Sequence, residues 1–334
     1  MTAAAVLSDV LAATPGGRAG LLAQASSVDQ IDLSFSPASI LLLNAILALV
    51  MFGVALDVRV DDLRRVVQDP RGPLIGLTAQ FVLLPALTFG LTQVLDPAPS
   101  IALGMILVGA SPGGNISNFI AHLARGNTML SISMTAASTV LATVLTPLNF
   151  AFWGSLDPDT AELLTAIRLD PLELVLTIAL LLGVPVAVGM WIQHTRPGLA
   201  DRLKRPMRIF SLAFFALFVA VAFVSNWQNF LDFIGLVALA VLLHNALALS
   251  GGYAAARAFG LPERDRRAIA IEVGIQNSAL SLALIFSFFD GLGGMALVAA
   301  WWGIWHIVAG MSLARFWAWR DGADLTDPLT TDAA

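Results

Sequence analysis

Apolar residues are gathered in nine long runs that are separated by short polar segments. Most of these runs approach the length of about 20 residues that an α-helix needs to cross a bilayer. The pattern predicts an all-α polytopic membrane protein with nine transmembrane helices. The runs extend approximately over residues 38–56, 73–95, 100–122, 128–153, 171–193, 207–226, 229–256, 267–289 and 293–318.

The third run is interrupted near its middle by the sequence Gly109-Ala-Ser-Pro-Gly-Gly-Asn-Ile-Ser-Asn118. Pro112 removes a backbone donor, and Gly113 and Gly114 are poor helix formers, so a continuous helix is not expected there. Unwound backbone persists at membrane depth only where it is buried in protein or lines a cavity. The break therefore gathers free carbonyls and side-chain oxygens in one place, which favours an ion site.

The eighth run carries a second interruption, Glu272-Val-Gly-Ile-Gln-Asn277. Runs 1 to 4 and runs 6 to 9 form two four-helix units, and the single run between them turns the second unit upside down relative to the first. The two interruptions then hold corresponding positions in inverted halves, which is typical of transporters with a binding site near the bilayer midplane. The sequence therefore predicts an inverted-repeat transporter with two discontinuous helices.

Composition excludes several classes of protein. Of the 334 residues, 57% are hydrophobic and only 12% are charged, whereas soluble domains carry about 25% charged residues. The mean hydropathy is +0.81. The chain has no cysteine, which rules out a disulfide scaffold and a thiolate metal site. No basic patch persists outside the short loops, so a nucleic acid partner is not expected.

The positive charges predict the orientation in the membrane. If the amino terminus lies outside, 16 of the 18 Lys and Arg residues fall on the inner side, and Arg18 and Arg168 remain outside. This strong bias follows the positive-inside rule. We therefore expect the N-terminus outside and the C-terminus in the cytoplasm. Residues 1–37 would form an N-terminal extramembrane segment, and residues 319–334 a cytoplasmic tail.

Glu272 is the carboxylate that lies well inside an apolar run. Carboxylates within a membrane are costly and usually face a partner or a transport pathway. Arg267, five positions earlier, leaves open an interfacial position for this acid. In the alternative that we favour, a bound cation supplies the missing positive charge, and hard cations such as sodium choose oxygen ligands.

Hydroxyl, amide and imidazole groups in other runs are further candidates. Ser131 and Thr135 lie four residues apart on one helical face. Hydroxyls in membrane helices also bond their own i−4 carbonyl or aid packing, so both interpretations stay open. Gln80 is a larger polar group in an apolar run. His306 is a further candidate, although a lone histidine within a span is more often a hydrogen-bonded packing residue than a ligand.

At these residues the sequence resembles the bile acid:sodium symporter family, over about residues 38–320, and it is similar to bacterial members. The resemblance implies a core domain with two discontinuous helices that cross, beside a panel domain. The panel would comprise residues 38–56 and 171–226, and the core residues 73–153 and 229–318. The matching segments are Pro112–Asn118, Leu123–Asn127, Ser131–Thr139, Leu243–Asn245, Glu272–Ser278 and Trp305–His306.

The resemblance also implies two sodium sites and a substrate site beside the crossing. The first sodium site would use Ser117, Asn118, Ser131, Thr135 and Glu272. The second would use Gln80, Glu272, Gln276 and the carbonyls of Val273 and Ile275. The substrate would lie near Asn115, Asn277 and His306.

The resemblance implies sodium-coupled symport of an organic anion by alternating access in the bacterial inner membrane. The protein would not be an enzyme, and sodium would be a transported ion, with no cofactor. Asn115 and Ile307 differ from the threonine and asparagine of relatives, so the anion could be bile acid-like or a smaller carboxylate. The alternatives are a proton-coupled carrier in which Glu272 titrates, a channel, and an intramembrane hydrolase using Ser117 with His122 or His306.

Overall fold

The computed structural model describes residues 37–166, 171–225, 227–289 and 292–321, and these residues are mostly helical. The predicted segment 1–37 lies outside the described residues except for Pro37, and so does most of the predicted tail 319–334. The elements are α3 (Pro37–Ala55), α4 (Val60–Gln68), α5 (Arg71–Thr78), η1 (Ala79–Leu83), α6 (Leu84–Leu95), α7 (Pro99–Ala110), α8 (Ile116–Leu123), α9 (Thr128–Gly154), α10 (Pro158–Ala166), α11 (Pro171–Thr195), α12 (Pro197–Ser225), α13 (Trp227–Ala258), α14 (Glu263–Gly274), α15 (Ser278–Phe288) and α16 (Gly293–Arg320).

Helices occupy all of the predicted apolar runs. Within the described part of the chain, five helical segments are long and apolar enough to cross a membrane. Other apolar segments are shorter, and two of these, α7 and α15, are halves of the interrupted runs. The five long segments are Arg71–Leu95, Thr128–Gly154, Val175–Thr195, Val237–Ala258 and Gly293–Arg320.

Some helices extend beyond their apolar runs. Helix α12 begins at Pro197, whereas the apolar run was expected to begin at residue 207, and α14 begins at Glu263 and not at residue 267. Hydropathy marks the part of a helix that contacts lipid or protein interior, while backbone hydrogen bonding continues into the polar flanks. As a result, several charged residues that the sequence suggested were in loops lie on helices.

Both predicted interruptions are present. Helix α7 ends at Ala110 and α8 begins at Ile116, while α14 ends at Gly274 and α15 begins at Ser278. Ser111, which follows α7, and Ile275, which follows α14, have extended backbone conformations. Each interrupted run therefore consists of two half-helices, α7 with α8 and α14 with α15, and a short segment with extended backbone joins the two halves of each pair.

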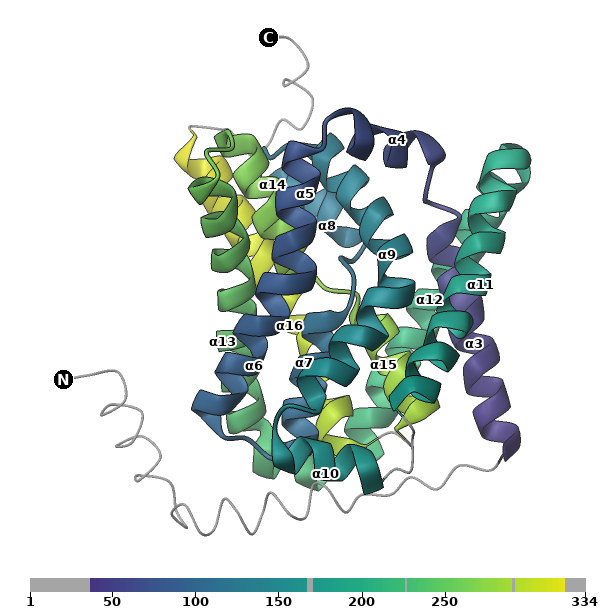
Figure 1. Ribbon diagram of the computed structural model, residues 1–334, viewed down its shortest axis with the longest axis vertical. Helices are drawn as coiled ribbons and strands as arrows, with labels where there is room; N and C mark the ends of the chain where they lie inside the picture. The colour runs from purple at the N-terminus through teal and green to yellow at the C-terminus, as the bar shows by residue number, and fades with distance from the viewer. Residues whose placement is uncertain (1–36, 167–170, 226, 290–291, 322–334) are drawn as a thin grey trace, which may run out of the picture.

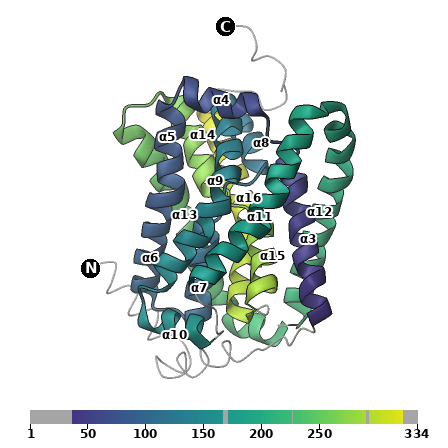
Figure 2. The same cartoon turned by 45° about the vertical axis from the view of Figure 1, so that its right-hand side comes forward.

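Helices α3, α11 and α12 pack against one another at one side of the molecule, and the remaining helices form a larger group beside them (Figures 1 and 2). Helix α4 and the end of α16 lie at the same end of the molecule, and α10 lies at the opposite end (Figure 1). Helices α7 and α15 lie between these ends, next to α16. The two interruptions consequently lie deep within the molecule.

Close helix packing holds α7 in the centre. Every residue from Ser100 to Ala110 is buried. At Gly104, an added Cβ would lie 2.8 Å from the Met295 α-carbon on α16, so only glycine permits this approach. Small residues at helix contacts are the usual means of close packing inside membranes. This contact helps to fix the position at which α7 ends.

Candidate functional site

The two interruptions pair directly through their backbones. Gly113 and Gln276 form an isolated antiparallel β-bridge. The Gly114 amide donates to the Ile275 carbonyl at 2.8 Å, and the Asn277 amide donates to the Pro112 carbonyl at 2.9 Å. These bonds satisfy backbone groups that the broken helices leave free, which is necessary away from water.

Glycine is required where the two segments meet. A Cβ at Gly113 would collide with the Glu272 carboxylate, and a Cβ at Gly114 would lie 3.2 Å from the Gln276 carbonyl oxygen. The end of α7 is held by Thr146 on α9, whose hydroxyl donates to the Ala110 carbonyl at 2.8 Å. The Pro-Gly-Gly sequence therefore provides both the helix break and the space for the buried acid.

Glu272 lies at the centre of a hydroxyl cluster and has no solvent exposure. Ser117 donates to one carboxylate oxygen at 2.6 Å and Ser131 donates to the same oxygen at 2.9 Å. Thr135 donates to the other oxygen at 2.6 Å. None of the ion pairs recorded for the described residues includes Glu272. The interfacial position considered for Glu272 is therefore wrong, because the acid is fully buried beside the bridge.

Oxygen lone pairs outnumber protons in this cluster. The Ser131 hydroxyl lies 2.9 Å from both Glu272 and Asn118 Oδ1. The Thr135 hydroxyl lies within reach of Glu272, of Asn118 Oδ1 at 3.1 Å and of the Ser131 carbonyl at 3.0 Å. Because each hydroxyl has only one proton to donate, these acceptors cannot all be satisfied at once. Such an excess of acceptors suits a bound cation.

Gln80 belongs to a second oxygen cluster beside the bridge, which includes Gln276. It lies in η1, a π-helical turn, and such turns are frequent at functional sites. Its amide nitrogen donates to the Ser111 carbonyl at 2.8 Å and to Gln276 Oε1 at 2.7 Å. The Gln276 amide in turn donates to the Val273 carbonyl. Gln80, Gln276 and Val273, three of the expected ligands of the second sodium site, therefore lie together.

The remaining oxygens of the second cluster differ in their availability. The Gln80 Oε1 atom is buried and has no hydrogen-bond partner. The Ile275 carbonyl accepts the Gly114 amide, so one of its lone pairs is engaged in the bridge. No group of three or more His, Cys, Asp and Glu side chains lies together in the described part of the chain. The first cluster offers hydroxyl, amide, carbonyl and carboxylate oxygens, and the second offers amide and backbone carbonyl oxygens.

The three expected substrate residues, Asn115, Asn277 and His306, line one cavity of about 460 Å³. The beginnings of α8 and α15 form part of its wall, together with α3, α12 and α16. Asn277 caps α15 by accepting the Leu280 amide at 3.1 Å. His306 is buried, and its Nδ1 atom has no hydrogen-bond partner. The cavity thus adjoins the bridge, because Gly114 and Gln276 also line it.

Three charged residues that the sequence did not suggest also line this cavity: Asp57, Lys204 and Arg208. From the sequence, Lys204 and Arg208 were expected only among the positive charges on the inner side. Their spacing of four residues would have placed them on one face if α12 had been extended through them. Asp57 follows α3 directly, at the end of the first apolar run.

The comparisons with known proteins agree with this architecture. The family model described as the Sodium Bile acid symporter family matches residues 44–233. The chain is 32% identical to the "Uncharacterized sodium-dependent transporter YocS" of Bacillus subtilis, over 81% of each chain. The chain belongs to the sodium bile acid symporter family. The resemblance inferred from the two interrupted motifs is thereby confirmed.

More distant members of the sodium bile acid symporter family are also similar. The chain is 32% identical to the "Probable sodium/metabolite cotransporter BASS1, chloroplastic" of Arabidopsis thaliana, over 81% of this chain and 65% of the relative. It is 29% identical to the "Ileal sodium/bile acid cotransporter" of Homo sapiens, over 73% of this chain and 68% of the relative. Membership makes the chain a multi-pass membrane transporter and not an enzyme, in a family where sodium is a transported ion.

His244 and Asn245 on α13 contact neighbouring helices. His244 Nε2 lies 2.6 Å from the Thr88 hydroxyl, and its ring packs on Trp302 with centroids 4.6 Å apart. Asn245 donates to the Gly274 carbonyl at 2.8 Å, at the last residue of α14. In this family member, α13 therefore supports the end of the broken helix α14.

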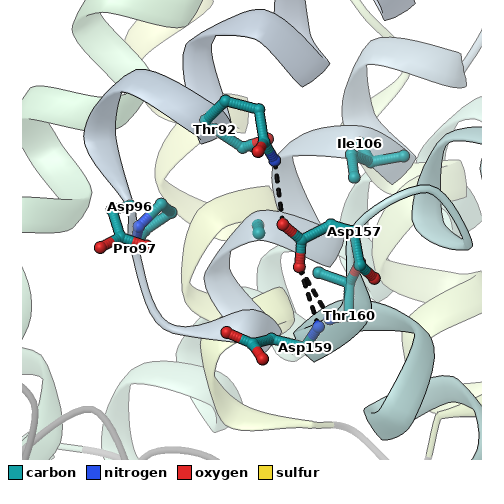
Figure 3. A pocket seen from close by; sticks show the side chains of 9 residues that line it. Thr92, Asp96, Pro97, Ile106, Asp157, Asp159 and Thr160 are labelled. Atoms are coloured by element: carbon teal, nitrogen blue, oxygen red, sulfur yellow. Dashed lines mark hydrogen bonds between the residues drawn. The ribbon is translucent and has the colours of Figure 1, made fainter.

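A second, smaller cavity of about 50 Å³ lies near α10, at the end of the molecule opposite α4 (Figures 1 and 3). Its Asp157 accepts a hydrogen bond from Gln93 at 3.0 Å and two from the amides of Asp159 and Thr160. The Gln93 contact, opposed by burial, lowers the pKa of Asp157. The Asp157 side chain thus caps the start of α10, at the end of the molecule away from α4.

Proposed function

We propose that this family member is a sodium-coupled symporter that carries an organic anion by alternating access. The observation that supports the proposal best is the buried Glu272 carboxylate, whose hydrogen bonds come from the three hydroxyls of Ser117, Ser131 and Thr135. A carboxylate in a membrane interior without a cationic partner is costly. A sodium ion would neutralise it and use the surplus of oxygen lone pairs.

The first sodium ion would bind among Glu272, Asn118 and the three hydroxyls. The second would bind Gln80, Gln276, the Val273 and Ile275 carbonyls and the nearer oxygen of Glu272. The unpartnered Gln80 Oε1 supports this second site, because burying an amide oxygen without a partner is unfavourable. The first ion would tie the two interruptions together, since its site takes oxygens from both, and the second would tie the second interruption to Gln80 in η1.

The substrate would bind in the 460 Å³ cavity beside the bridge. Asn115, Asn277 and His306 offer it polar contacts, and α8 and α15 both begin at its wall. Helix N-termini favour anions through their free amides and their dipoles. Relatives are named for bile acid and metabolite cotransport. These features support an organic anion, either bile acid-like or a smaller carboxylate.

Alternating access would move a core of residues 73–153 and 229–318 against a panel of residues 38–56 and 171–226. The grouping of α3, α11 and α12 at one side supports this division (Figure 1). The cavity lies between the bridge and helices α3 and α12, so it would lie at the interface that moves. We further propose nine spans, in which the interrupted helices hold equivalent places in two inverted halves.

The transporter would lie in the bilayer of a bacterial inner membrane, with no nucleic acid partner, its N-terminus outside and its C-terminus in the cytoplasm. The positive-inside bias supports this orientation, although Arg18 and Arg168 lie outside the described residues. Asp57, Lys204 and Arg208 would then mark a cytoplasmic mouth of the cavity. The inward sodium gradient would drive uptake, and the membrane potential would add about 2.3 kcal/mol per charge for each 100 mV.

Uptake into proteoliposomes tests the proposal. The purified chain would be reconstituted in vesicles, and an inward sodium gradient would be imposed at fixed pH by adding sodium outside. Radiolabelled taurocholate, pantoate and pyruvate would serve as probes. We expect saturable uptake of at least one probe that is lost when choline replaces sodium. Absence of uptake of all three, or uptake that choline leaves unchanged, would contradict the proposal.

The proton-coupled alternative also rests on Glu272, because a buried carboxylate can carry a proton as well as bind a sodium ion. The same vesicles separate the two. Uptake driven by an imposed pH gradient in choline buffer would favour the proton carrier, whereas uptake that needs sodium at equal pH on both sides favours the symporter. Flux that rises linearly with substrate concentration would indicate a channel.

A further inference from the structure

Asp57 contacts donors from both sides of the large cavity. Its carboxylate lies 3.6 Å from the Arg208 guanidinium and 4.0 Å from the Lys204 ammonium, both on α12. It also accepts a long hydrogen bond, of 3.4 Å, from the amide of Asn115 in the first interruption. One carboxylate is therefore shared by two cations and by an amide that belongs to the expected substrate site.

These contacts are long for charge-assisted hydrogen bonds, which usually measure about 2.7–2.9 Å. Arg208 is 68% exposed, and Lys204 has a closer partner in Asp201 at 3.0 Å. The ion pairs of Asp57 are therefore weak, because they are long and partly screened by solvent. A second carboxylate could replace Asp57 at the same donors at little cost.

The lining of the cavity fits an anion with an apolar body. The charged lining residues are two cations and one acid, which leaves an excess of one positive charge. The rest of the wall is largely apolar, with side chains such as Val50, Leu212 and Phe119. An amphipathic molecule with one carboxylate would match both the charge and the surface.

We infer that Lys204 and Arg208 determine specificity for a carboxylate substrate, and that Asp57 is an internal carboxylate that competes with the substrate for them and for Asn115. This inference rests on the proposed function and names the residues that select its anion. Substrate binding displaces Asp57, and the substrate carboxylate then links α12 to the interruption that also carries the sodium ligands.

Removal of a positive charge and removal of the negative charge at this cluster should change KM in opposite directions. In Lys204→Gln and Arg208→Gln the donor is lost, so KM for the carboxylate probe should rise about fivefold in each, which corresponds to about 1 kcal/mol. In Asp57→Asn the competitor is lost, so KM should fall. Arg208→Lys keeps a charge at the site and should restore most of the affinity.

The test measures initial rates of sodium-dependent uptake at saturating sodium for whichever probe the wild-type chain transports. Arg205→Gln is the matched control, because Arg205 is exposed on the same helix and does not line the cavity. Its KM should equal that of the wild type. The Vmax of Lys204→Gln and Arg208→Gln should change much less than KM.

Two outcomes would overturn the inference while leaving symport intact. One is a wild-type KM in all three charge variants. The other is a lower Vmax with unchanged KM in all three, Asp57→Asn included, which would show that the cluster only holds the helices together. If the wild-type chain itself shows no sodium-dependent uptake, the proposed function fails first, and the inference fails with it.

Discussion

Replacing Glu272 with glutamine removes the buried charge and keeps the shape of the side chain. The carboxylate has no solvent exposure, and its three hydrogen bonds measure 2.6–2.9 Å. The amide of Glu272→Gln offers one acceptor oxygen in place of two, so one hydroxyl donor must turn elsewhere. Asn118 Oδ1 and the Ser131 carbonyl are already within reach of these hydroxyls, so the substitution should not unfold the protein.

The size of the effect follows from the charge. Two unit charges about 4 Å apart attract by about 4 kcal/mol when the effective dielectric constant is 20. Part of this attraction offsets the cost of removing both ions from water. If about 3 kcal/mol remains, sodium binding to Glu272→Gln should be weaker by a factor of roughly 100 or more. Without sodium the variant should be at least as stable as the wild type, because the uncompensated buried charge is gone.

Thermal unfolding in detergent measures this directly. Wild-type protein should melt at a higher temperature in sodium chloride than in choline chloride of equal ionic strength, because a ligand at 100 times its Kd stabilises by about 2.7 kcal/mol. Glu272→Gln should lose that difference, and its sodium-dependent uptake should be abolished. Glu162→Gln, an exposed position on α10, should behave as the wild type. A sodium-dependent shift of wild-type size in Glu272→Gln would refute the assignment of the carboxylate.

Three further substitutions test neighbouring features. Gly113→Ala should lower sodium-dependent uptake more than tenfold, because its Cβ meets the Glu272 carboxylate, whereas Gly90→Ala, where nothing lies within 4 Å, should not; equal rates would contradict the close approach. Gln80→Ala should bring the Hill coefficient for sodium towards one, because one of two coupled ions loses its site; an unchanged coefficient would exclude Gln80 as a ligand. The Arg267 hydrogen bond lowers the pKa of Asp321 in the folded protein. This contact should therefore stabilise the fold at pH values above the ordinary aspartate pKa of about 3.9, and its contribution should be lost as the pH falls through the lowered pKa of the folded state. The melting temperatures of wild type and Asp321→Asn should therefore differ by a constant amount from pH 5 to pH 8 and converge below about pH 4; a gap that persists in acid would show that the ion pair is not its cause.

The sequence predicted the elements of the site better than their connections. Proline and glycine at Pro112, Gly113 and Gly114 were sufficient to predict the first break, because their effect on a helix is local. The spacing of Ser131 and Thr135 likewise predicted that both hydroxyls lie on one face of the helix, and in the structure both donate to Glu272. These features depend on a few neighbouring residues and on helix geometry alone.

Features that depend on tertiary packing were not predictable in this way. The β-bridge between Gly113 and Gln276 joins residues far apart in the sequence, and no local pattern encodes it. The π-helical turn around Gln80 has no sequence signature that distinguishes it from an ordinary helix. Lys204 was missed because it precedes the apolar run that was expected to begin at residue 207, whereas α12 begins at Pro197; Arg208, at the start of that run, was counted only as a charge.

In the first interruption, only a few covalent bonds separate the wall of the cavity from the hydroxyl cluster around Glu272. Asn115 lines the cavity, and Ser117, two residues later, donates to Glu272 at 2.6 Å. The position of this segment is fixed on its other side by the bridge to Gln276. A sodium ion that draws Ser117 and Glu272 together must therefore also set where Asn115 lies. By linkage, a substrate that binds Asn115 better in that position would strengthen sodium binding by the same factor, so in the proposed mechanism this short segment would couple the two ligands.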